Sequence, residues 1–244
     1  MSVALPAQDP PEKPEPPAKK EEKELTPRQK KIAELFHATK VEFTDEGHIV
    51  LEYDFQSENE ILLEDFAPKI STTKNRIRWA IRNETGLMIA MHGNWVHNAE
   101  FRGTVKAEVK GVSYAMMDGG DYRVVGLFGS KGKKMIGSNV GKQLVRLTGM
   151  KLRDAMPRTF PETRVEEKLD FGFALEKGVL FNVRGGREKE STTEKPKFTK
   201  GFEVGRIGLR WQGRTQMCIH TVRIQGKLDP KWLDKQIGKA PKKE

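Results

Sequence analysis

Residues 205–229 read GRIGLRWQGRTQMCIHTVRIQGKLD, and this stretch decides the fold. Two runs alternate apolar and polar residues, which is the period of a β-strand with one buried face. The polar residues 212–215 supply the turn between the runs. We therefore expect two strands whose apolar faces close a core, with tryptophan and histidine side chains in structural roles. The residues that share a face are Ile207, Leu209 and Trp211 in the first run, and Cys218, His220, Val222 and Ile224 in the second.

The same period of two recurs along most of the chain, over residues 49–55, 76–82, 104–110, 168–176 and 179–183. Lys177-Gly178 reads as a hairpin turn between the last two of these strands. Residues 122–129 are apolar on both faces, which indicates a central strand, and residues 187–197 read as an exposed polar loop. Many short strands with few helices predict an all-β antiparallel sandwich.

The two ends of the chain differ from this pattern. Residues 1–25 are rich in Pro, Lys and Glu and predict a disordered tail. Residues 26–39 predict a short helix with Thr26 as N-cap and Pro27 in the first turn. We assign residues 40–230 to the β-sandwich and residues 231–244 to a basic C-terminal tail. Residues 131–160 suit a helix or two short strands, and we favour a strand-containing excursion from the sandwich.

Composition excludes several classes of site. The single cysteine, Cys218, rules out an intrachain disulfide and a cysteine-based zinc site. The five histidines show no ligand spacing, so we expect no metal and no cofactor. No stretch approaches 18 apolar residues, so we expect no membrane span. Small residues before Gln8-Asp9 and a Pro-rich linker resemble the end of a signal peptide, which favours an extracytoplasmic location; a cytoplasmic protein with a flexible arm is the alternative.

Two segments resemble the concanavalin-A-like lectin/glucanase, or laminin-G-like, sandwich. The first is LFHATKVEFTDEGHIVLEYDFQSENEILLEDFAP (35–68), with Tyr53-Asp54-Phe55 and Glu64-Asp65-Phe66, and the second is GRIGLRW with HTVRIQGKLD. The resemblance covers residues 40–229 and is greatest to bacterial exported 3-keto-disaccharide hydrolase-like proteins. It implies a jelly-roll fold and a carbohydrate partner. No catalytic residue of that family can be carried over, and its relatives' calcium-binding acidic loops are not apparent.

An enzyme of this fold would need two carboxylates on one side of a sheet. Glu52 and Asp54 share a strand face and are the weak catalytic candidates. A polar pair on the solvent face of a strand is the ordinary outcome, which we favour. The sequence has no GxSxG, HExxH or phosphate-binding loop.

A sugar-binding site is suggested by MHGNWVHN (91–98), which reads as a turn. Residues on loops contribute to ligand binding more often than to core packing. Trp95, with Asn94 and His97, is therefore a candidate ligand-binding group. Trp95 folded back onto the core is the equal alternative.

A basic face is the remaining candidate. Residues 71–244 hold 35 basic and 18 acidic residues, within a chain of formal net charge +10. Arginine offers two parallel hydrogen bonds to a carboxylate or phosphate, whereas pairing with Glu or Asp of adjacent strands is the structural alternative. The candidates are Arg76, Arg78 and Arg82 on one strand, and Arg206 and Arg210 on another.

These observations support a non-catalytic, extracytoplasmic, lectin-like module that binds carbohydrate, with an acidic polysaccharide suited to the basic face. One alternative is a glycoside-active or 3-keto-disaccharide hydrolase of the same fold. The other is a polyanion- or nucleic-acid-binding module, with nucleic acid the less favoured partner.

Overall fold

The structure is a computed structural model that describes residues 24–55, 65–67, 87–89, 93–113, 122–129, 134–139, 144–148, 151–152, 167–191, 199–212 and 217–238. The helices are α1 (Pro27–Ala33) and α3 (Pro230–Ile237). The strands are β1 (Lys40–Phe43), β2 (Ile49–Asp54), β3 (Phe66–Ala67), β4 (Leu87–Ile89), β5 (Gly93–His97), β6 (Phe101–Ser113), β7 (Tyr122–Gly129), β8 (Lys134–Asn139), β9 (Leu144–Thr148), β10 (Lys151–Leu152), β11 (Glu167–Glu176), β12 (Val179–Arg184), β13 (Arg187–Ser191), β14 (Val204–Gln212) and β15 (Met217–Leu228).

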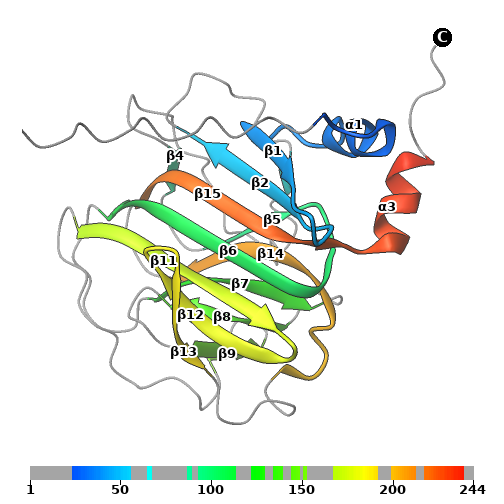
Figure 1. Cartoon of the computed structure of the whole chain (residues 1–244). Helices are drawn as coiled ribbons and strands as arrows, with labels where there is room; N and C mark the ends of the chain where they lie inside the picture. Colours follow the sequence, from blue (N-terminus) through cyan, green and yellow to red (C-terminus); the bar gives the residue numbers. More distant parts are fainter. Residues whose placement is uncertain are drawn as a thin grey trace, which may run out of the picture.

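The strands build two layers (Figure 1). The first layer runs β1-β2-β15-β6-β11-β12-β13, with β4 also paired to β15, and the second runs β3-β5-β14-β7-β8-β9-β10. The layers join where β14 pairs with the start of β6, Val204 opposite Arg102 and Gly205 opposite Phe101. In Figure 1, β2, β15, β6 and β11 cross the front, and β14, β7 and β8 lie behind them. The pairs among the described strands are antiparallel, which confirms the all-β sandwich.

The core lies between the two layers and follows the period of two. Alternate residues of each strand point inward because successive side chains of a strand lie on opposite faces. β7, expected as a central strand, lies between β14 and β8 and is buried on both faces. Inward side chains that are at most 2% exposed include Leu51, Tyr53, Val109, Phe171, Phe173, Val222 and Ile224 from the first layer, and Trp95, Leu127, Ile207 and Leu209 from the second.

The two strands of the opening stretch enter different layers. β14 pairs with β7, β5 and β6, whereas β15 pairs with β6, β2 and β4. A bulge at His220 shifts the register of β15, since Ile219 lies opposite Gly111 and Thr221 opposite Lys110. Before this bulge Ile219 packs in the core cluster, and His220 is half-buried. The single alternation expected through His220 is therefore wrong, because a bulge inserts one extra residue. The side chain of Trp211 lies outside the described residues.

Local signals placed some elements correctly and missed others. Thr26 caps α1 and Pro27 opens it, as expected. Lys177 and Gly178 have φ values of 47° and 75°, the conformation of a tight hairpin turn between β11 and β12. The loop expected over 187–197 is wrong for its first part, which forms β13. Residues 131–160 contribute β8, β9 and β10 to the second layer rather than an excursion, and α3 occupies part of the expected C-terminal tail.

Strands β7 and β8 of the second layer approach each other closely at Gly126, and a substitution there tests this packing. A Cβ at this position would meet the carbonyl oxygen of Ile136 and lie 2.8 Å from the Cα of Gly137. We expect Gly126→Ala to lower the free energy of unfolding by about 1–3 kcal/mol through overpacking, measured by urea denaturation. Gly129→Ala in the same strand is the control, because its nearest neighbour is Gly201 O at 3.2 Å. Equal stability of the two variants would contradict the expectation.

Candidate functional site

A cavity of about 620 Å³ lies at one end of the sandwich, between the segment after α1, the helix α3 and the ends of β5 and β14. Figure 1 shows α1 and α3 at this same end of the molecule, although they come from opposite ends of the described chain. The lining is a mixture of aromatic, acidic and basic side chains. It comprises Leu35, Phe36, His37, Asp65, His97, Asn98, Ala99, Glu100, Arg206, Lys231, Trp232, Lys235 and Gln236. We call it the end cavity.

The helix α3 is fixed against the sandwich by its first turn. The Asp229 carboxylate accepts the backbone N–H of Trp232 at 3.1 Å, and Pro230 follows in the first helical position. The backbone N–H of Asp229 donates to Glu100 O at 2.8 Å. The indole of Trp232 then stacks on the Phe36 ring, with centroids 6.0 Å apart. This contact links α3 to the segment after α1 and makes one aromatic wall of the end cavity.

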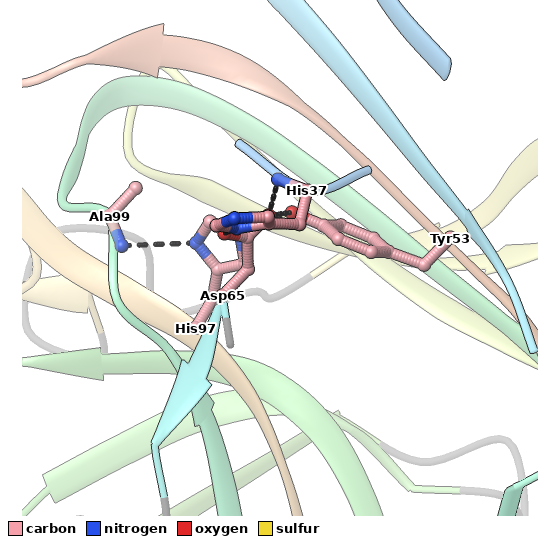
Figure 2. Close-up of polar contacts among 5 residues, drawn as sticks. All are labelled: His37, Tyr53, Asp65, His97 and Ala99. Carbon is pink, nitrogen blue, oxygen red and sulfur yellow. Dashed lines mark hydrogen bonds and ion pairs between the residues drawn. The ribbon is translucent and has the colours of Figure 1, made fainter. Parts of the chain in front are cut away.

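Asp65 is the polar centre of the site. It is only 5% exposed. Its Oδ2 accepts the backbone N–H of His37 and the hydroxyl of Tyr53, each at 2.7 Å. Its Oδ1 lies 3.1 Å from Nδ1 of His37. A buried carboxylate is costly unless donors satisfy it, and these contacts join three separate segments of the chain (Figure 2).

His97 extends this network into the core. Its Nδ1 accepts the N–H of Ala99 at 3.0 Å, and its Nε2 lies 2.8 Å from the Tyr53 oxygen. Burial lowers the pKa of His97 to about 4, against smaller opposing effects of the Asp65 charge. Burial also raises the pKa of Tyr53 well above its ordinary value, reinforced by Asp65. Both side chains are therefore neutral at physiological pH.

Hydrogen-bond directions follow from these neutral forms. A carboxylate only accepts, so Tyr53 donates its single proton to Asp65. The Tyr53 oxygen then accepts from Nε2 of His97, whose Nδ1 accepts from Ala99. On the other side, Nδ1 of His37 donates to Asp65. We call this chain of contacts, from Ala99 through His97, Tyr53 and Asp65 to His37, the relay (Figure 2).

Aromatic rings enclose the buried half of the relay. Phe66 stacks on Trp95 with centroids 3.9 Å apart and meets the ring of Tyr53 edge-on at 4.9 Å. Phe55 and Phe101 lie against Trp95 and His97 respectively. Such pairs exclude water and add packing energy. This apolar surrounding is what keeps His97 uncharged.

The sugar-binding residues expected in a turn lie in strand β5. Trp95 is 0% exposed and occupies the core, so its ring offers no face to a ligand. Asn94 points to the opposite face of the layer and is 4% exposed. His97 is 1% exposed, and it belongs both to the lining of the end cavity and to the relay. The turn predicted over residues 91–98 is wrong for residues 93–97, because they form a strand that pairs with β14 and β3.

The arginines do not form one exposed patch in the described residues. Arg206 lines the end cavity, where its Nη2 and Nε lie 2.8 and 3.2 Å from Oε1 of Glu100. Arg210 lies opposite Asn94 on the neighbouring strand and is 5% exposed. Pairing with an adjacent carboxylate, one of the two possibilities raised by the sequence, is thus what Arg206 does. Arg76, Arg78 and Arg82 lie outside the described residues.

The carboxylates Glu52 and Asp54 lie away from the end cavity. Glu52 stands opposite Arg223 on β15, and Arg223 in turn stands opposite Glu108 on β6. Glu52, Glu108 and Arg223 line a separate groove of about 330 Å³ on the outer face of the first layer. Opposite charges thus face one another across these strands, and the carboxylate of Glu108 lies 3.6 Å from Nζ of Lys106. A catalytic role for Glu52 or Asp54 stays a prediction.

Of the residues that line the end cavity, the sequence analysis named only His97 and Arg206 as site candidates. Among those it missed are His37, Asp65, Glu100 and Trp232. His37 sits just after a short helix, and Asp65 appeared only within a structural motif. Trp232 belonged to a segment expected to be a tail. The signal available was Asp229-Pro230 followed by Trp232-Leu233, which is typical of a capped helix with an apolar face.

The described residues contain no group of three or more His, Cys, Asp or Glu side chains placed to hold a metal ion. Among the helices that the structure describes, none has the length and apolarity needed to cross a membrane.

No protein-family model matches the chain, and no curated protein matches it in sequence. Solved structures do. The Crh5 transglycosylase in complex with NAG matches at 14% identity with a TM-score of 0.51, over 74% of this chain and 85% of that one. A native glycosidic hydrolase matches at 8% identity with a TM-score of 0.50, over 72% of this chain and 94% of the other.

The fold is a concanavalin-like sandwich. At these identities the likeness is one of architecture, and function has to be argued from the site itself. Membership of the 3-keto-disaccharide hydrolase-like branch stays a prediction.

The low pKa of His97 predicts a pH-dependent stability. The unfolded histidine binds its proton near pH 6.5 and the folded one near 4, so between these values the unfolded state holds more protons. The contribution of neutral His97 to the free energy of unfolding is complete above pH 6.5. It decreases by roughly 3 kcal/mol as the pH falls to 4.

Urea denaturation at pH 7 and pH 4 measures this effect. His97→Gln is the matched variant, because its amide nitrogen can donate to Tyr53 but does not titrate. We expect the wild type to lose roughly 3 kcal/mol more than His97→Gln over this interval. The same pH dependence in both proteins would show that His97 does not carry the effect.

Proposed function

We propose that this protein binds carbohydrate and that the end cavity is the binding site. The observation that carries the proposal is the lining of the cavity, where the Phe36–Trp232 aromatic wall stands beside fixed polar groups of Asp65, Glu100 and Arg206. A sugar ring has an apolar face that stacks on aromatic rings and hydroxyls that need oriented hydrogen-bond partners. The volume, about 620 Å³, is within the range of small-molecule sites. The concanavalin-like architecture supports the proposal as an analogy only.

The charges of the cavity favour an acidic sugar. Arg206 is matched by Glu100, and the Asp65 carboxylate is matched by the donors of the relay. Lys231 and Lys235 also line the cavity, and their i, i+4 spacing puts them on one face of α3. Within the described part of the chain, neither lysine has an ion-pair partner. The ligand that complements this excess of positive charge carries a carboxylate, as a uronic acid does.

Trp232→Ala tests the place of binding. We expect about a fivefold to tenfold loss of affinity for the preferred glycan, because the variant removes an aromatic ring whose stacking on a sugar is worth on the order of 1 kcal/mol. The measurement is a glycan array followed by calorimetry on the best ligand. Trp232→Phe is the control, since it keeps an aromatic ring against Phe36. Undiminished binding by folded Trp232→Ala would exclude the end cavity.

The double variant Lys231→Gln/Lys235→Gln tests the acidic ligand. We expect about a tenfold loss of affinity for a uronate-containing oligosaccharide and little change for its neutral counterpart, since partly exposed ion pairs are each worth up to about 1 kcal/mol. Raising the salt concentration should weaken the first interaction only. Lys177→Gln/Lys200→Gln removes the same charge at exposed positions outside the cavity lining. Equal affinity of the wild type for acidic and neutral ligands would contradict the acidic preference.

A further inference from the structure

The guanidinium of Arg206 has two hydrogen-bonding edges, and Glu100 occupies one of them. Nε and Nη2 of Arg206, which form the side-on edge, donate to the same oxygen, Oε1 of Glu100, at 3.2 and 2.8 Å. The end-on edge, made by Nη1 and the second N–H of Nη2, has no acceptor among the residues that the structure describes. The Arg206 side chain is 33% exposed and lines the end cavity. Two parallel N–H groups are therefore open to a ligand there.

We propose that Arg206 recognises the carboxylate of a uronic acid in the end cavity, through two parallel hydrogen bonds from its end-on edge. This inference rests on the proposed carbohydrate-binding function of the same cavity. It goes beyond that function because it assigns the specificity-determining residue and the geometry by which an acid is distinguished from its ester. Glu100 is a positioning residue that acts through Arg206.

Glu100 can orient Arg206 because its own backbone is fixed. It directly precedes β6, and both of its chain neighbours are at most 1% exposed. Its carbonyl oxygen accepts the backbone N–H of Asp229 at 2.8 Å, and Asp229 is the N-cap of α3. The contact that attaches α3 to the sandwich is thus made by the same residue that holds the guanidinium. The open edge of Arg206 therefore has a defined place relative to the first turn of α3.

The charges of the lining accommodate one more carboxylate. Among the described lining residues there are three arginine or lysine side chains, Arg206, Lys231 and Lys235, and two carboxylates, Asp65 and Glu100. A ligand carboxylate on Arg206 brings the two signs into balance, and the lysines offset its repulsion by Glu100. The lysines attract any anion as point charges, whereas the guanidinium is matched by two acceptor atoms in its own plane.

The open edge suits a carboxylate better than a sulfate ester. The two oxygens of a carboxylate lie in one plane and use both N–H groups of the edge. A sulfate ester has a further charged oxygen outside this plane, for which the edge offers no donor. Oε2 of Glu100 accepts no hydrogen bond in the described part of the chain. A uronic acid carries hydroxyls beside its carboxylate, and one of these can donate to Oε2.

The experiment measures binding by calorimetry. The probes are oligosaccharides of galacturonate and of glucuronate, each as the free acid and as its methyl ester, with dextran and dextran sulfate as neutral and sulfated glycans. The key variant is Arg206→Lys, which keeps the positive charge beside Glu100 but has no planar edge. Arg102→Lys is the matched control, because Arg102 is exposed on β6 and lies outside the cavity lining. Urea denaturation of all three proteins compares their stability.

We expect the wild type and Arg102→Lys to bind at least one of the two acids, and its methyl ester at least about tenfold more weakly. Arg206→Lys should bind that acid about 10- to 100-fold more weakly than the wild type, with its affinity for the ester unchanged. Wild-type affinity of Arg206→Lys for the acid would overturn the inference, as would equal affinity of the wild type for acid and ester.

Binding of dextran sulfate as tight as that of the acids would overturn the recognition of a carboxylate. In each of these cases a glycan is still bound, so the proposed carbohydrate-binding function stands. Absence of binding to every probe would overturn both proposals.

A second readout follows the two edges of the guanidinium separately. In nitrogen-15 NMR, the Nε signal of Arg206 reports on the edge held by Glu100, and the Nη signals also report on the open edge. The loss of these signals in Arg206→Lys identifies them. On adding the bound uronate oligosaccharide, we expect the Nη signals to shift and the Nε signal to stay. Unchanged Nη signals would show an ion pair with a structural role alone, and a shifted Nε signal would show displacement of Glu100; either would overturn the inference.

Discussion

The buried carboxylate of Asp65 is the interaction on which this end of the molecule depends. It receives donors from the segment after α1 and from β2, and its own backbone carbonyl receives the N–H of Asn98 beyond β5 at 2.7 Å. Three segments distant in sequence are thus joined at one residue. Removing any single donor leaves a buried charge less well satisfied, and such groups are expensive. The segment after α1, Asp65 and Asn98 all line the end cavity, together with α3 and Arg206 of β14.

The two-layer sandwich supplies what Asp65 needs. Tyr53 follows Ile49 and Leu51 on the inward face of β2, so its ring packs in the core while its hydroxyl reaches the carboxylate. The aromatic rings around it exclude water and lower the local polarity. Burial in that setting lowers the pKa of His97 and raises the pKa of Tyr53, so both side chains of the relay are neutral. The relay has a defined direction because the core around it is dry.

The sequence was informative where local rules operate. Alternation in β2, β6, β11, β12 and β14 identified strands and their inward faces, because the side-chain period of a strand is fixed by its backbone. The N-cap at Thr26 and the turn at Lys177-Gly178 were readable for similar local reasons. The all-β sandwich therefore followed from pattern alone.

What the sequence did not indicate depends on contacts between distant segments. The bulge at His220 is set by how β15 pairs with β6, and nothing within the strand marks it. Trp95 was a candidate loop residue because the polar stretch MHGNWVHN (91–98) surrounds it, yet pairing with β14 places it in the core. The end cavity combines His37, Asp65, Arg206 and Trp232, and only the tertiary fold brings these together.

The location of the cavity has a thermodynamic consequence. Its aromatic wall is built from opposite ends of the described chain, Phe36 after α1 and Trp232 in α3, whose ring centroids lie 6.0 Å apart. A site built this way exists only while both segments are docked on the sandwich. Any ligand that binds between them favours the docked state by the free energy of its own binding. Docking of α3 in turn supplies the lysines that a ligand carboxylate would contact. Ligand binding and the docking of these two segments on the sandwich are therefore thermodynamically coupled.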